Sequence, residues 1–379
     1  MLNGARQTGK STLVKSLFQD SHKQYTLDDL SILSAVKNDP EAFLKSHSYP
    51  LVIDEVQRAP ELFLPLKKVV DQDRKPGQFV LTGSAQILNL PVLADSLAGR
   101  MDIHTLWPLS ATEILDSRFS FVDMIFTDEP FIETFHTSEK AVDILLGGYP
   151  DVLKRTTEAQ QETWCDSYVQ TLLYRDLKDV ASIENVSALM QLLSVVAARA
   201  GSLLNIDELS RSTQIPATSV KRYLTALQWL FLVVSIPAFS GNLSRRLIKA
   251  PKLYMNDVRL LRYFMGLDHS LVTQGKIIEN FVAMELLKQI TWASRKTNLY
   301  HYRTASGLEI DFILERMDGK KVAVEVKSAS TFNPRFFNVM KTIEGLHRGV
   351  VFYQGEHEIH SSPNLWCLPL AYLYTNAVK

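Results

Sequence analysis

Cysteine is scarce in this chain of 379 residues. The two cysteines, Cys165 and Cys367, stand far apart, and neither belongs to a group with the spacing of a metal site. Such sparse usage suits a reducing compartment and excludes a disulfide framework. Because 46% of the residues are apolar, we expect packed cores to hold the fold together instead.

The chain also lacks a net charge and a long apolar run. Its 41 basic and 41 acidic residues cancel, so any contact with nucleic acid or a membrane must come from a local patch. No stretch is apolar over the roughly 20 residues that a membrane helix needs, and no N-terminal segment has the pattern of a signal peptide. We expect a soluble, cytoplasmic protein of two to three domains.

What the sequence does contain, near its beginning, is a glycine-rich loop. Residues 4–11 fit the pattern G-x-x-x-x-G-K-[ST], which typically cradles phosphates. Its two glycines let the backbone curl into a nest of N–H donors, its lysine places a charge between the terminal phosphates, and its serine can ligate Mg²⁺. The residues expected to bind a nucleotide here are Gly4, Ala5, Arg6, Gln7, Thr8, Gly9, Lys10, Ser11 and Thr12.

Two later stretches predict strands that carry the polar partners of such a loop. Residues 51–55 form a short apolar run that ends in two acids, as expected of a buried parallel strand with its tip at a metal site. Asp54 would hold Mg²⁺ through water, and Glu55 would polarise the attacking water as a general base. Residues 78–84 predict a further strand, whose terminal Ser84 could orient that water or sense the γ-phosphate.

Four motifs together, at residues 4–11, 52–57, 81–84 and 97–100, resemble those of AAA-type ATPases that pair this core with a C-terminal DUF4143 region. The resemblance covers nearly the whole chain, and it implies ATP and Mg²⁺ as ligands and ATP hydrolysis as the activity. It also implies that Arg100 is an arginine finger or sensor, with a solvated arginine at a helix end as the alternative. One departure is the first strand: residues 1–3 are too few for a usual strand of about five, so it is truncated or another element supplies that edge.

The element pattern predicts an α/β protein with four parts. Residues 1–110 alternate strand-like and helix-like stretches, which is typical of a parallel sheet covered by helices and here predicts the P-loop core. By analogy, the mostly helical residues 111–180 form the lid of the ATPase. Residues 181–255 predict a winged helix. The resemblance implies that residues 256–379 form a DUF4143 domain, with a restriction-endonuclease-like α/β fold.

Two details of the lid segment bear on the site. Ser110 and Glu113 have the spacing of a capping box, which marks the start of a helix. Arg175 could reach a phosphate from the lid, and the alternative is an ion pair with Asp176 or Asp179.

The predicted winged helix carries a local basic patch. Asn205 is expected to cap its first helix, and residues 218–230 form a second helix that can lie in a major groove. Residues 231–236 and 246–249 would form the strands of the wing. Packing between domains is the alternative to DNA contact. The patch, which would contact phosphates rather than read bases, consists of Lys221, Arg222, Arg245, Arg246 and Lys249.

Further along, two alternating stretches at residues 308–315 and 321–327 predict a hairpin. A two-residue turn would place Asp311 and Glu325 on opposite faces of it. A three-residue turn with a left-handed Gly319 makes these two acids face each other, with Cβ atoms roughly 5 Å apart. We predict this second turn.

In that register Glu309 faces Lys327, and an ion pair between them could keep the lysine from acting in catalysis. The spacing of Asp311, Glu325 and Lys327 resembles the active-site signature of PD-(D/E)xK nucleases, as does the DUF4143 region. That resemblance implies that Asp311 and Glu325 bind Mg²⁺ or Mn²⁺ and that Lys327 positions or activates water. Glu279 would be a further metal ligand, since it lies on the apolar stripe of a helix, where an unpaired carboxylate is costly.

The sequence therefore predicts an ATP-binding protein, a Mg²⁺-dependent ATPase that is coupled to nucleic-acid binding or processing. Its expected partners are ATP and, through the winged helix and the C-terminal domain, DNA; membranes are not expected, and oligomerisation is left open. The alternative is a nucleotide-dependent switch or scaffold whose nuclease-like domain is an inactive, ion-paired relic.

Overall fold

The computed structural model describes residues 1–84, 99–128, 143–177, 183, 185–240, 249–266, 274–304 and 306–375. It divides into two compact units, each assembled from separate stretches of the chain. Unit 1 comprises residues 1–108, 149–186 and 222–232, and unit 2 comprises residues 109–148, 187–221 and 233–379. The segment predicted to be the lid is thus divided between the two units.

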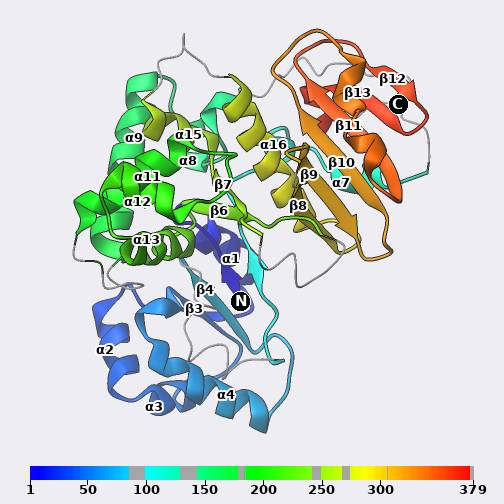
Figure 1. The fold of residues 1–379 in the computed structure, drawn as a ribbon. Coiled ribbons are helices and arrows are strands. Elements are labelled where there is room, and N and C mark those ends of the chain that lie inside the picture. Colours follow the sequence, from blue (N-terminus) through cyan, green and yellow to red (C-terminus); the bar gives the residue numbers. More distant parts are fainter. Residues whose placement is uncertain are drawn as a thin grey trace. The chain divides into compact units, whose positions relative to one another are not determined.

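Unit 1 is built on a five-stranded sheet of order β2-β3-β4-β1-β5, in which all pairs are parallel (Figure 1). Its short first strand is paired on both sides, because Leu2 aligns with Thr82 of β4 and with His104 of β5. The last strand of this sheet ends at Thr105. The strands are β1 (Leu2–Asn3), β2 (Lys23–Thr26), β3 (Leu51–Asp54), β4 (Phe79–Gly83) and β5 (His104–Thr105).

Helices cover this sheet and bury its apolar strands. Ile53 of β3 packs in one core with Val36, Phe43 and Leu66, which come from three helices in succession. This pattern follows from the continuous apolar run of β3, which only a sheet covered on both faces can bury. The helices of unit 1 are α1 (Lys10–Phe18), α2 (Leu30–Asn38), α3 (Pro40–Lys45), η1 (Val56–Arg58), η2 (Pro60–Leu62), α4 (Phe63–Gln72), α8 (Pro150–Leu153), α9 (Glu158–Thr171) and the π-helical turn η5 (Leu172–Asp176).

Unit 2 contains a six-stranded sheet of order β12-β13-β11-β10-β9-β8 and a separate two-stranded ribbon of β6 and β7. Helix α16 lies against β8 and β10 of the larger sheet (Figure 1). The strands are β6 (Val233–Ile236), β7 (Lys252–Met255), β8 (Thr297–Arg303), β9 (Glu309–Arg316), β10 (Lys321–Val326), β11 (Leu346–Tyr353), β12 (Ile359–Ser362) and β13 (Leu365–Pro369).

Helices of different lengths complete unit 2. The capping box predicted at Ser110 forms, since Ser110 and Glu113 each accept a hydrogen bond from the other's backbone N–H. The helices are α6 (Ala111–Ile114), α7 (Phe121–Ile125), η4 (Ile144–Leu146), α11 (Val186–Ala198), α12 (Ile206–Thr213), α15 (Val258–Met265), α16 (Gln274–Ile290), η7 (Pro334–Phe337), η8 (Met340–Thr342) and η9 (Leu370–Leu373); Val186 of α11 belongs to unit 1, and α13 (Ala217–Trp229) begins in unit 2 and ends in unit 1.

The turn between β9 and β10 has the predicted bulged form. Gly319 is left-handed with φ +84°, and Arg316 N donates to Lys320 O at 3.0 Å. The ladder aligns Val324 with Phe312, the register that places Asp311 opposite Glu325. The three-residue turn is therefore confirmed.

The two helices predicted for the winged helix form, as α12 and α13. Asn205 caps α12 through Glu208 N. β6 pairs with β7, residues 252–255. Of the predicted wing strand at residues 246–249, residues 246–248 lie outside the described residues. Arg245 and Arg246 of the basic patch lie outside the described residues.

Candidate nucleotide-binding site

The glycine-rich loop joins β1 to α1 in unit 1. Gly4 and Gly9 have φ values of +148° and +96°, which L residues rarely adopt. At Gly4 a side chain would also clash, since a Cβ there would lie 2.1 Å from Leu106 O. Because α1 begins directly after Gly9, its first backbone N–H groups have no partner within the helix and are available to an anion.

Lys10 reaches back across this loop. Its Nζ donates to Gly4 O at 3.0 Å and to Ala5 O at 2.6 Å, and the residue is 5% exposed. Burial lowers the pKa of Lys10 to about 8, although the carboxylates of Glu55 and Asp54 act in the opposite direction. Neutral carbonyls are weaker acceptors for an ammonium group than phosphate oxygens, so a bound triphosphate would compete well for this lysine.

Asp54 lies at the tip of β3, next to the first turn of α1. Ser11 Oγ donates to Asp54 Oδ2 at 2.9 Å, and the Thr82 hydroxyl donates to the other oxygen. The structure thus brings together the two residues predicted to hold Mg²⁺. A hydroxyl and a carboxylate fit this ion, which prefers hard oxygen ligands and keeps several waters.

Glu55 is held by two polar neighbours. Because β4 lies between β1 and β3, Ser84 at its end meets Glu55, and Ser84 Oγ donates to Glu55 Oε2 at 3.0 Å. The side-chain amide of Gln57 donates to the same oxygen and to Ser84 Oγ. Gln57 was not among the residues predicted for the site, although it stands two residues after the acid. A carboxylate restrained in this way suits a general base, which must be positioned before its proton transfer.

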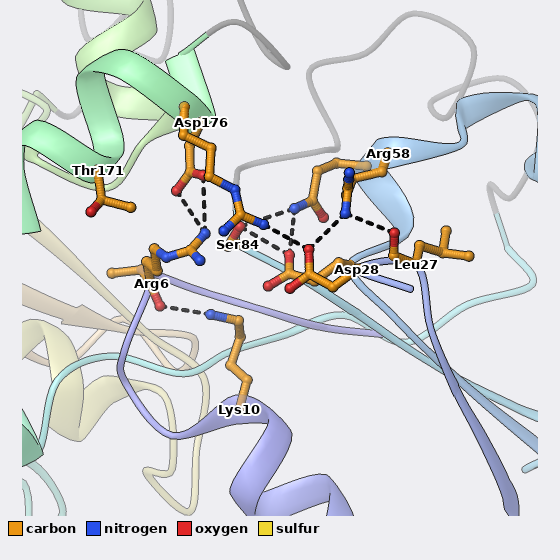
Figure 2. A network of polar contacts seen from close by, with 12 residues as sticks. Arg6, Lys10, Leu27, Asp28, Arg58, Ser84, Thr171 and Asp176 are labelled. Atoms are coloured by element: carbon orange, nitrogen blue, oxygen red, sulfur yellow. Dashed lines mark hydrogen bonds and ion pairs between the residues drawn. The ribbon is translucent and has the colours of Figure 1, made fainter. Parts of the chain in front are cut away.

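The outer residues of the loop are tied to α9 and the π-helical turn that follows it, through two contacts that we call the loop clamp. Arg6 Nη1 lies 3.0 Å and 3.1 Å from the two carboxylate oxygens of Asp176, and Trp164 Nε1 donates to Gln7 Oε1 at 2.9 Å. Figure 2 shows Arg6 and Asp176 turned toward each other, near Lys10. Burial raises the pKa of the Asp176 carboxyl, against the effect of Arg6.

The two arginines considered for phosphate contact pair with acids. Arg175 Nη2 lies 2.7 Å from Asp28 Oδ1 and its Nε lies 3.9 Å from Asp176 Oδ1; the other predicted partner, Asp179, lies outside the described residues. Arg58 shares the Asp28 oxygen at 2.7 Å (Figure 2). Arg100 pairs with Asp71 of α4 at 2.6 Å, so its use as a finger or sensor stays a prediction.

A second polar cluster, in unit 2, contains the residues predicted as a nuclease-like site. Asp311 N donates to Glu325 Oε2 at 3.2 Å, and Val326 N donates to Asp311 Oδ2 at 2.9 Å. Lys327 Nζ pairs with Glu325 Oε1. The possible ion pair between Lys327 and Glu309 does not form, because Glu309 pairs with a different lysine.

That lysine is Lys252, which the sequence analysis missed. Its Nζ lies 2.7 Å from Glu309 Oε1, 3.1 Å from Glu279 Oε1 and 3.5 Å from Asp311 Oδ1, and the residue is 2% exposed. Tyr254 OH also donates to Glu279 Oε1, at 2.7 Å. The signal was a lysine and a tyrosine two positions apart in an otherwise apolar strand, which places both polar tips on one face.

The charges of this cluster oppose the effect of burial. Burial alone would lower the pKa of Lys252, yet Glu279, Asp311 and Glu309 together raise it above its usual value. Burial and the nearby Asp311 raise the pKa of Glu325 to about 7, although Lys327 acts in the opposite direction. Burial likewise raises the pKa of Glu279. Burial and the neighbouring acid therefore disfavour the anionic forms of Glu279 and Glu325, and Lys252 and Lys327 only partly oppose that effect.

Three family models match the chain. An AAA domain matches residues 1–115, the domain of unknown function DUF8612 matches residues 142–271, and the domain of unknown function DUF4143 matches residues 274–373. No helix in the described parts of the chain combines the length and apolarity that a membrane crossing requires.

Similar proteins include the uncharacterized protein Rv2008c of Mycobacterium tuberculosis, which is 29% identical over 99% of this chain and 80% of its own length. The uncharacterized protein MJ1544 of Methanocaldococcus jannaschii is 21% identical over 83% of this chain and 71% of its own length. Among solved structures, a point-substituted RuvB from Thermotoga maritima aligns over 62% of this chain and 80% of its own, at 17% identity and a TM-score of 0.28, which is too low to bear on the fold.

Proposed function

This chain pairs an AAA domain with a C-terminal DUF4143 domain, and on that premise we propose that it binds ATP and hydrolyses it with Mg²⁺, in support of work on nucleic acid. The observation that carries the proposal is the hydrogen bond of Ser11 to Asp54 at 2.9 Å. It joins the glycine-rich loop to the acid-tipped strand, and these are the two elements that a phosphoryl-transfer site requires.

Each residue has a role in this proposal. The loop amides and Lys10 bind the β- and γ-phosphates, and Lys10 exchanges its carbonyl partners for phosphate oxygens. Ser11 and Asp54 would hold Mg²⁺, which would neutralise charge that develops on the phosphates. Glu55 accepts a proton from the water that attacks the γ-phosphorus as the bond to the ADP oxygen breaks, while Ser84 keeps the Glu55 carboxylate in place.

Replacement of Glu55 tests the hydrolytic part. In Glu55→Gln the amide cannot take the proton, so ATP hydrolysis should fall by about 10²- to 10⁴-fold, while ATP binding persists. Glu61→Gln, at an exposed position of the same unit, is the matched control and should leave both unchanged. A Glu55→Gln variant that hydrolyses ATP at the wild-type rate would refute the assigned base.

The nucleic-acid part of the proposal is supported by exposed basic residues, Lys221 at the start of α13 and Lys249 before β7. Such residues bind phosphates without reading sequence. We propose that residues 181–255 work as a winged helix and residues 256–379 as a restriction-endonuclease-like domain on the same DNA. Stimulation of ATP hydrolysis by duplex DNA would support this coupling, and a rate unaffected by DNA at low salt would speak against it.

A second function is favoured by one observation, the buried Lys252 among the acids of the C-terminal domain. In this version the protein is a nucleotide-dependent switch or scaffold, and its nuclease-like domain cleaves nothing. The two functions differ in Mn²⁺-dependent cleavage of DNA, which the first allows and the second excludes.

A further inference from the structure

We propose that Lys252 is the resident cation of the acidic cluster in the C-terminal domain, and that its ammonium group excludes a divalent metal ion from that cluster. The acidic cluster consists of Glu279, Glu309, Asp311 and Glu325, and Lys252 reaches it from β7. The proposal concerns this cluster alone, so it stands or falls independently of the nucleotide site.

The position of Lys252 carries the first step. Its Nζ lies within 3.5 Å of oxygens from Glu279, Glu309 and Asp311, which come from α16 and β9. A lysine that is 2% exposed is strongly disfavoured unless anions surround it. Conversely, carboxylates at such short range repel one another unless a cation or a proton lies among them, and Lys252 provides the cation.

The hydrogen bonds of the acids carry the second step. A metal ion requires carboxylate oxygens that are free to turn toward one point at about 2.0–2.6 Å. Here Asp311 Oδ2 accepts from Val326 N, Glu325 Oε2 accepts from Asp311 N, and Glu325 Oε1 pairs with Lys327. Throughout the described parts of the chain, no group of three or more His, Cys, Asp or Glu side chains is arranged to hold a metal ion. The predicted metal ligands therefore do not fit that role as they stand.

The packing around Glu279 carries the third step. Tyr254 OH and Lys252 Nζ both contact its Oε1. Gly201 has φ +78°, and a Cβ there would lie 2.9 Å from the same oxygen. The backbone at Gly201 therefore packs directly against the Glu279 carboxylate. A hydrogen bond from Gly201 N to Leu253 O, at 2.8 Å, holds the backbone in this position. Little room remains on that side for an ion with its waters.

Binding of Mn²⁺ without nucleotide tests the proposal in the full-length chain. All variants carry Asp54→Asn, so that the nucleotide site contributes no metal binding, and free Mn²⁺ is measured by electron paramagnetic resonance at neutral pH. We expect the same weak binding with and without Asp311→Asn. Lys252→Met should gain one site, with an affinity at least about tenfold above that background, and the added Asp311→Asn should remove it. Lys249→Met, a neighbouring exposed lysine, is the matched control and should gain nothing.

Two results would overturn the proposal. One is a saturable Mn²⁺ site in the chain with Lys252 intact that Asp311→Asn abolishes. The other is a folded Lys252→Met variant, checked by circular dichroism, that binds no more Mn²⁺ than its parent. If Lys252→Met fails to fold, the comparison with and without Asp311→Asn decides the question alone, and Lys252→Arg, which keeps the charge, should fold and bind no additional Mn²⁺.

Discussion

Lys10 and Lys252 are both buried lysines, but their partners differ and shift their pKa values in opposite directions. Lys10 is 5% exposed and donates to two backbone carbonyls, and the pKa of its ammonium group is lowered to about 8. Lys252 is 2% exposed and lies among three carboxylates, which raise its pKa.

Burial alone therefore does not make a lysine functional. A lysine held by neutral acceptors loses little when a more strongly charged ligand replaces them, so Lys10 is prepared to bind an anion. A lysine already neutralised by acids has no such capacity, because any new anion must compete with partners that are fixed in place. On this comparison we propose that the first region is a binding site and the second a structural ion cluster.

The largest expected difference between the two sites concerns the effect of a metal ion on ATP hydrolysis. Removal of Mg²⁺ by a chelator, or Asp54→Ala, should lower ATP hydrolysis by at least about 10²-fold, because the charge on the phosphates is no longer neutralised. Steady-state phosphate release measures this. The matched change Asp311→Ala in the C-terminal cluster should leave ATP hydrolysis at the wild-type rate, and an equal loss in both variants would contradict the distinction.

A third buried basic residue, His301, should make stability depend on pH. His301 is 1% exposed and contacts Ala250 O through Nε2 at 3.0 Å, and burial lowers its pKa to about 4. The imidazole stays neutral in the folded chain and charges more readily in the unfolded one. The stability that neutral His301 contributes should therefore be fully present above a pH of about 6.5. As the pH falls toward about 4, the free energy of unfolding should decrease by up to about 3 kcal/mol.

Thermal melts between about pH 8 and pH 4, which span that titration range, measure the loss. His301→Met should have a shallower decline of the melting temperature across this window than the wild type. His104→Met, at an exposed position, should follow the wild-type curve. Parallel curves for His301→Met and the wild type would show that His301 does not carry the effect.

The loop clamp should have a smaller effect on stability. Asp176→Ala leaves Arg6 half-buried without its carboxylate, so the free energy of unfolding should fall by about 1–2 kcal/mol. The exposed pair of Lys154 and Asp151, 3.6 Å apart, offers a control, and Asp151→Ala should cost less than about 0.5 kcal/mol. Urea denaturation compares the two, and equal costs would mean that the clamp contributes no more than a surface ion pair.

The smallest effect concerns DNA. Lys221→Ala should weaken binding to duplex DNA by a few fold regardless of sequence, and should reduce the slope of log affinity against log salt by about 1. Fluorescence anisotropy at several salt concentrations measures the slope. An unchanged slope would remove α13 from the proposed DNA contact.

Local patterns were sufficient to predict much of both regions. The glycine-rich loop, the acid-tipped β3 and the hydroxyl end of β4 follow from spacing and strand periodicity, since each is read within a few residues. The register of β9 and β10 followed from turn chemistry, because Gly319 permits the left-handed bulge.

What could not be predicted is which distant segments meet. Lys252 reaches acids that stand 27 to 59 positions further along the chain, and no local pattern specifies such a contact. The same holds for the partner of β6, and for Gln57, whose neighbour Ser84 comes from the next strand. The division of residues 111–180 between two units likewise depends on tertiary packing.

Lys10 is the central residue of the proposed nucleotide site, and a titration with MgATP tests its role directly. The wild type should bind saturably, Lys10→Ala should bind at least about 10²-fold more weakly, and Lys15→Ala, on an exposed face of the same helix, should match the wild type. If Lys10→Ala binds MgATP as tightly as the wild type, the glycine-rich loop is not the nucleotide site.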